Sequence, residues 1–218
     1  MGYCGRFSTA CGAGAATGVL VAVVLSAGAA AREEEPTCAV PRRPIVCRAY
    51  HVFRREARRA DRLPRQFRDV PPLRRVKQSS SRLVGRGRPK QHRFYLLGGR
   101  RLVCLLDYTP AQRGGAFVCS YVRHALAGRF FLESACEPPP RRHRVLYAQP
   151  MPDGVHRAVF RRVHRPRVRV KVRRNLLVAD LRIPSRAYLP TRVTWWRHGR
   201  RRSMGLGVNE GLLHCGPG

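Results

Sequence analysis

Ser120 and His124 stand four residues apart, a spacing that would place a hydroxyl nucleophile and an imidazole base on one face of a helix. A serine hydrolase also needs a third group that orients the histidine and a sharp turn that presents the nucleophile. The sequence around this pair provides neither of them. We therefore do not expect an enzyme.

Carboxylate chemistry and metal binding find equally little support. The chain has no Cys-x-x-Cys pair, and His214 and Cys215 are adjacent rather than at the spacing of zinc ligands. The acidic residues between positions 107 and 180 stand singly, so we expect them to form ion pairs with arginine rather than acid–base pairs. These residues are Asp107, Glu133, Glu137, Asp153 and Asp180. The sequence thus predicts no metal and no cofactor.

Positive charge dominates the composition. Of 218 residues, 44 are Lys or Arg and 12 are Asp or Glu, which gives a formal net charge of +32. Such a field favours a polyanionic partner: nucleic acid, a sulfated glycan, an anionic membrane or an acidic protein surface. GC-rich coding would explain why arginine replaces lysine, but Asp and Glu codons are also GC-compatible. Selection for polyanion binding and a spurious reading frame in GC-rich DNA both remain as explanations of the basic bias.

The stretch RVRVKVRR, residues 167–174, alternates strictly between cationic and apolar residues. In a strand, Val168, Val170 and Val172 would face a core, and the opposite face would carry four cations about 7 Å apart. These cations are Arg167, Arg169, Lys171 and Arg173. Heparan sulfate or an acidic protein surface would match such a row, whereas a solvated outer face is the simplest interpretation of an isolated strand.

Other basic residues near this strand, among them Arg161 and Arg162, favour a functional basic patch. Arg200, Arg201 and Arg202 add three consecutive cations, and we include them in the candidate polyanion-binding site. Trp195 and Trp196 precede them. Beside Arg197, this pair could give an aromatic contact for a ligand or partner, whereas one tryptophan of such a pair is more often in the core.

A second basic motif resembles an AT-hook, a short peptide that lies in the minor groove of A·T-rich DNA. Its residues are Arg86, Gly87, Arg88, Pro89 and Lys90. Such a match arises easily by chance in a chain rich in Arg, Gly and Pro. An exposed basic loop is the competing interpretation.

Residues 1–31 have the layout of a secretory signal peptide. One charge precedes an apolar run over 15–27, and Ala29 and Ala31 form the small-residue pattern of a cleavage site. An uncleaved anchor is the weaker alternative, because the strongly apolar part, 19–25, is short beside a span of about 20 residues. We expect cleavage after Ala31, secretion of the chain, and no stable membrane span after removal of the leader.

The cysteine content agrees with export. Six cysteines follow the leader, an even number that allows three disulfides in an oxidising compartment, with the connectivity left open. The candidates are Cys38, Cys47, Cys104, Cys119, Cys136 and Cys215.

Two regions follow the leader. Residues 32–91 are rich in Arg and Pro, and their apolar residues recur at helical spacing until Pro64. The residues in this pattern are Val46, Tyr50, Phe53, Ala57 and Ala60. The remainder, 64–91, has the composition of a flexible basic connector.

Residues 92–218 have the pattern of a folded domain. RFYLLGG and RLVCLLDY, separated by Gly98 to Arg101, predict a hairpin. GAFVCSYVRHALAGR predicts a helix that Gly128 closes, with a stripe of Phe117, Val118, Tyr121, Val122, Ala125 and Leu126. Five strands follow, at RVLYA, GVHRAVFRRV, RVRVKVR, LLVADLRI and RVTWWRH. The predicted fold is α+β: a mainly antiparallel sheet with one or two helices, stapled by disulfides, behind an Arg-rich N-terminal segment.

The order of these features resembles that of the small secreted accessory subunits that cytomegaloviruses add to their gH/gL envelope glycoprotein dimer. The matching elements are the leader, the Arg/Pro-rich segment, FYLLGGRRLV, a helix ending in ALAGR, and AVFRRVHRPRVRVKV. The resemblance covers roughly residues 92–180. It implies a virion-surface subunit of a receptor-binding complex, with a chemokine-like element and a glycoprotein partner held by protein contacts or a disulfide.

Two functional hypotheses follow. The first is a secreted or envelope-displayed interaction protein that binds an acidic partner protein, a receptor or a sulfated glycan. The second is an intracellular nucleic-acid-binding protein that uses residues 86–90 and the basic strand, which would require residues 1–31 not to be a signal peptide.

Overall fold

The computed structural model describes residues 3–5, 38, 44–74, 76, 80–86, 92–128, 132–135, 143–162, 165–183 and 189–206. They form two antiparallel sheets with short helices, which confirms the predicted α+β fold. The five-stranded sheet has the order β1-β5-β4-β3-β2, and the seven-stranded sheet has the order β12-β11-β8-β9-β10-β7-β6.

The strands of the five-stranded sheet are β1 (Tyr3–Gly5), β2 (Ser81–Arg86), β3 (Arg93–Gly98), β4 (Leu102–Thr109) and β5 (Gly114–Tyr121). Those of the seven-stranded sheet are β6 (Leu132–Ala135), β7 (His143–Pro150), β8 (Arg157–Arg162), β9 (Arg165–Arg173), β10 (Leu176–Ile183), β11 (Pro190–Arg197) and β12 (Arg200–Gly205). The helices are α1 (Ile45–Ala49), α2 (Pro71–Arg74) and α3 (Val122–Leu126), with 3₁₀ turns η1 (His51–Arg54), η2 (Arg59–Asp61), η3 (Arg65–Phe67) and η5 (Pro110–Gln112).

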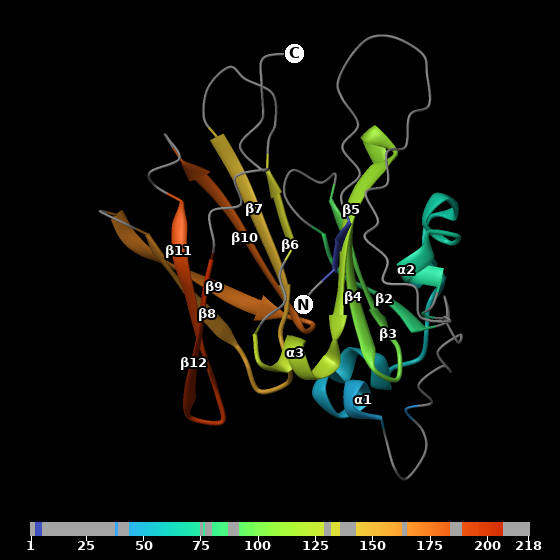
Figure 1. Cartoon of the computed structure of the whole chain (residues 1–218), viewed down its shortest axis with the longest axis horizontal. Helices are drawn as coiled ribbons and strands as arrows, with labels where there is room; N and C mark the ends of the chain where they lie inside the picture. Colours follow the sequence, from blue (N-terminus) through green and yellow to red (C-terminus); the bar gives the residue numbers. More distant parts are fainter. Residues whose placement is uncertain are drawn as a thin grey trace.

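The strands stack in three layers (Figure 1). The five-stranded sheet forms the first layer, β6, β7 and β10 form the middle layer, and β8, β9, β11 and β12 form the outer layer. β9 and β10 are paired only at Arg173 with Leu176 and at Val172 with Leu177, so the seven-stranded sheet folds over at this hairpin. One apolar core, with Phe94 and Leu146, fills the space between the first two layers. A second, with Leu177, lies between the middle and outer layers.

The expected hairpin after residue 92 is confirmed, since β3 pairs with β4 along its whole length. The helix expected over 115–129 is wrong in its first half. Residues 114–121 form β5, because every residue of that strand has a register partner on β4. The helix begins only at Val122, and Gly128 follows it with a φ of +83°, the left-handed conformation expected of a closing glycine.

The helix expected over 46–60 also proves shorter. Val46, Tyr50 and Phe53 are buried as predicted, but α1 ends at Ala49 and residues 55–58 are not helical. The physical reason lies outside the segment. The side chain of Asp153 accepts a hydrogen bond from the backbone N–H of His51, and that of Asn175 accepts one from Val52, so these N–H groups are not available to extend the helix.

The flexible connector expected over 64–91 is wrong for its described residues. η3 and α2 place Phe67 and Leu73 in a third apolar cluster, and β2 pairs with β3. The domain boundary expected after residue 91 therefore falls, along the chain, between β2 and β3, which pair with each other. β1, which pairs with β5, falls inside the expected leader, and the rest of residues 1–31 lies outside the described part.

Two disulfides are present, which confirms the predicted stapling. Cys38 is bonded to Cys47, and Cys104 is bonded to Cys119 across β4 and β5. The remaining candidates, Cys136 and Cys215, lie outside the described residues. Across the described part of the chain, no helix is long and apolar enough to span a membrane.

Candidate polyanion-binding face

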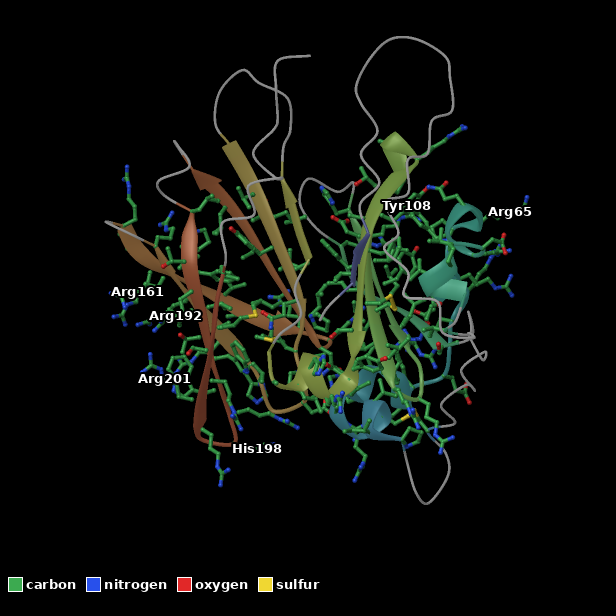
Figure 2. The ribbon with its side chains drawn as sticks, in the orientation of Figure 1. Arg65, Tyr108, Arg161, Arg192, His198 and Arg201 are labelled. Atoms are coloured by element: carbon green, nitrogen blue, oxygen red, sulfur yellow. A yellow bond between two sulfur atoms is a disulfide. The ribbon has the colours of Figure 1, made fainter. Side chains whose placement is uncertain are left out.

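The outer surface of the third layer carries a dense group of cations. Its four strands lie in the order β12-β11-β8-β9, and alternation directs one side of these strands toward the core and the other side outward. We call the exposed basic residues of this surface the cationic face: Arg157, Arg161, Arg167, Arg169, Lys171, Arg173, Arg192 and Arg201. In Figure 2, Arg161, Arg192 and Arg201 lie on one side of the molecule, opposite Arg65.

The predicted alternation of β9 is confirmed. Val168, Val170 and Val172 pack against the core between the middle and outer layers. The four cations of the strand are exposed, as expected from the sequence.

Register places cations directly opposite one another. Arg157 on β8 pairs with Lys171 on β9, and Arg161 on β8 pairs with Arg192 on β11. Like charges in directly opposite positions destabilise a sheet. The sequences of β8, β9, β11 and β12 contain no acidic residue that could offset this repulsion. The arrangement therefore favours binding of an external anion.

The two tryptophans divide as predicted. Trp195 is 2% exposed and belongs to the core between the middle and outer layers. Trp196 is 40% exposed and pairs in register with Arg201 on the cationic face. An exposed aromatic ring among guanidinium groups can contact the flat face of a ligand while the cations bind its charges.

The three consecutive arginines of the predicted site do not share one surface. Arg201 lies on the cationic face, because it pairs with Trp196. Arg202 pairs with the buried Trp195, so the side chains of Arg202 and Arg200 project from the face of β12 opposite to that of Arg201. Only the middle arginine of this run joins the row on β9.

Sequence reasoning missed two members of the cationic face, Arg157 and Arg192. On β8, Ala158 and Phe160 are buried and Arg157 lies on the opposite, exposed side. The alternation of residue types in RAVFRR is the sequence signal that indicates this placement. Arg192 belongs to a shorter alternation in which Val193 and Trp195 are buried, but only the register with β8 places it beside Arg161 on the face.

The AT-hook-like motif is only partly described. Arg86 is the last residue of β2 and is exposed. Gly87, Arg88, Pro89 and Lys90 lie outside the described residues. The motif stands in the connection between β2 and β3, so its role in nucleic-acid binding stays a prediction.

Asp61 is occupied by structural contacts. Its carboxylate accepts two hydrogen bonds from the Arg55 guanidinium, at 2.6 and 2.7 Å, and others from the backbone N–H groups of Arg58 and Leu83. Burial by itself would raise the pKa of Asp61, but these hydrogen bonds outweigh it and hold the pKa below its usual value.

Asp153 connects three segments of the chain. It accepts hydrogen bonds from the side chains of Asn175 and Arg54 and from the backbone N–H of His51. Burial would raise the pKa of the Asp153 carboxyl, but the hydrogen bonds from Asn175 and His51 lower it below the ordinary value. These acidic residues therefore stabilise the fold and do not neutralise the cationic face.

Ser120 and His124, whose spacing suits a catalytic pair on one helix, do not lie on the same helix. Ser120 is buried on β5, whereas His124 lies on α3 with its ring 5.8 Å from that of Tyr121. The expected shared helical face is absent because residues 114–121 are a strand. No group of three His, Cys, Asp or Glu side chains that could hold a metal ion occurs within the described ranges.

Comparison with known proteins adds no further assignment: no protein-family model, curated protein or solved structure matches this chain.

Proposed function

We propose that the protein is an extracellular or virion-displayed polyanion-binding protein whose cationic face binds a sulfated glycan of the heparan sulfate type. The observation that carries this proposal is the direct opposition of like charges at Arg157 with Lys171 and at Arg161 with Arg192. Such pairs destabilise the free sheet, and a bound sulfate chain would convert their repulsion into attraction.

The dimensions of the face suit a linear polyanion. Cations recur about every 7 Å along β9, and neighbouring strands are about 4.8 Å apart. A sulfated chain lying across the strands would meet cations on β9, β8, β11 and β12 in turn. Arginine also binds sulfate groups through two parallel hydrogen bonds, as it does other planar or tetrahedral oxyanions.

The disulfides support an extracellular setting over an intracellular one. Cys38–Cys47 and Cys104–Cys119 require an oxidising compartment to persist. A sulfated glycan or an acidic extracellular protein is a polyanion of that compartment, whereas nuclear DNA is not. The accessory-subunit role implied by the cytomegalovirus resemblance stays a prediction, in which an envelope glycoprotein would be the acidic partner.

Heparin-affinity chromatography of the full chain, secreted from mammalian cells, tests the proposal. The double variant R161Q/R192Q removes one opposed pair from the cationic face. R62Q/R65Q is the control, because it removes the same charge from exposed positions outside that face. We expect R161Q/R192Q to elute at clearly lower salt than the control. Heparin binding releases counterions at each charge contact, so a variant with fewer contacts binds more weakly and elutes at lower salt.

Two results would overturn the proposal. One is equal elution of the two double variants, which would mean that only net charge matters. The other is a reduced, uncleaved chain retained inside the cell, which would favour the nucleic-acid hypothesis. Intact mass with and without reductant, measured on medium and lysate, distinguishes this second result.

A further inference from the structure

A cavity of about 810 Å³ lies beside the cationic face, where β2 approaches the hairpin of β9 and β10. Its wall includes Leu83, Val84, Leu176 and Val178. Six basic side chains also line it: Arg55, Arg58, Arg86, Lys171, Arg173 and Arg174. The volume lies within the range of about 300–1,000 Å³ that is usual for small-molecule sites.

The cavity depends on a tight turn between β9 and β10. Arg174 and Asn175 form this two-residue turn with φ angles of 49° and 60°, the combination of a type I′ hairpin. Asn175 is buried and holds the turn in place, since its side chain accepts a hydrogen bond from the N–H of Val52 and donates one to the carbonyl of Met151. The basic side chains around the turn therefore project from a fixed backbone.

Close approach of β2 completes the cavity. A Cβ atom at Gly85 would lie 2.7 Å from Cδ2 of Leu176, closer than real side-chain contacts allow. Glycine thus lets β2 lie against β10 at this point, and it brings Arg86, at the end of β2, to the same cavity as Arg173 and Arg174.

The charges of the cavity are unbalanced. Asp61 is the only acidic residue among the residues that line it, and its carboxylate is already held by Arg55 and two backbone N–H groups. Arg58, Arg86 and Arg174 are exposed, and within the described residues none of them forms an ion pair with a carboxylate. Cations converging on one cavity repel each other unless an anion lies between them.

We propose that this cavity binds a short, multiply sulfated saccharide and is the primary subsite of the glycan-binding surface. The inference rests on the proposed function and deepens it. Lys171 and Arg173 belong both to the cavity and to the cationic face. A glycan bound in the cavity therefore continues along β9 onto Arg169 and Arg167. Short glycan chains occupy the cavity alone, whereas long chains contact both the cavity and the cationic face.

Isothermal titration calorimetry with a fully sulfated heparin tetrasaccharide and with a long heparin chain tests this division. The cavity variant is R58Q/R86Q, the face variant is R161Q/R192Q, and R62Q/R65Q is the charge-matched control. We expect R58Q/R86Q to weaken tetrasaccharide binding by about tenfold or more, as follows from the loss of two charged hydrogen-bonding partners. R161Q/R192Q should weaken the long chain more than the tetrasaccharide.

The outcomes separate the cavity from the function. If the long chain binds and responds to R161Q/R192Q, but R58Q/R86Q binds the tetrasaccharide as the control does, the cavity proposal is wrong and the proposed function stands. If the wild-type chain binds neither saccharide at low salt, the proposed function is wrong and the cavity proposal is wrong with it. Thermal unfolding of each variant establishes that its fold is retained.

Discussion

Arg161 and Arg192 lie directly opposite each other on β8 and β11, so the exposed side of this sheet places two arginines in one cross-strand pair. We expect Arg192→Glu to stabilise the free protein, because it replaces repulsion with a cross-strand ion pair worth roughly 0.2–1 kcal/mol. The melting temperature at low salt should rise by about 0.4–4 °C for a chain of this size. Heparin affinity should fall in the same variant.

Salt provides the control for this substitution. Exposed charge pairs are screened at about 1 M salt, so the gain in melting temperature should disappear there. A variant that melts at or below the wild-type temperature at low salt would contradict the electrostatic account of the pair.

Asp61→Asn tests two contacts of one carboxylate: the ion pair with Arg55, and the hydrogen bond from the backbone N–H of Leu83 that ties this segment to β2. The side chain of Asp61 is 3% exposed and accepts hydrogen bonds from Arg55 and from backbone N–H groups. We expect a loss of about 2–4 kcal/mol in the free energy of unfolding, because the amide leaves Arg55 without its counter-charge. Urea denaturation measures the loss. Glu56→Gln, at an exposed neighbouring position, should change stability by less than about 0.5 kcal/mol.

Acid should destabilise the protein through Asp61 and Asp153. Both carboxyls have a pKa below the usual value in the folded chain, so the unfolded chain binds protons first as the pH falls. Their contribution is fully present above about pH 4, the pKa of a carboxyl in an unfolded chain, and is lost as the pH decreases through the folded-state values. Denaturation measured from pH 7 to pH 2 should show this loss.

Replacing Asp153 with Asn should flatten the acid dependence in part, since Asp61 still titrates in that variant. An identical pH profile for wild type and Asp153→Asn would show that Asp153 does not contribute to it.

Gly128→Ala should destabilise the protein through two effects at one position. Gly128 has a φ of +83°, and an added Cβ would lie 2.2 Å from Cη2 of the buried Trp195. Strain and displacement of this ring together should cost about 2 kcal/mol or more. Gly205→Ala is the matched control, because an added Cβ there meets nothing within 4 Å. Similar melting temperatures for both variants would argue against this packing.

Several parts of the fold could be predicted because their signals are local. The hairpin of β3 and β4 follows from two apolar runs around Gly98, and the alternation of β9 follows from a period of two. Other parts could not. β2 carries few apolar residues, and the composition of its sequence is that of a connector, yet pairing with β3 makes it a strand. Residues 114–121 suit a helix by periodicity, but pairing with β4 overrides that preference.

Composition alone gives the charge of this protein. The cationic row of β9, and the placement of one residue of the Trp195–Trp196 pair in the core, follow from the amino-acid pattern because alternation along a strand is a local property. Which other cations join that row depends on how the strands pair in the folded protein. Register between strands is non-local, and a shift of one residue moves every side chain to the opposite face. It placed Arg157, Arg192 and Arg201 on the cationic face and excluded Arg200 and Arg202.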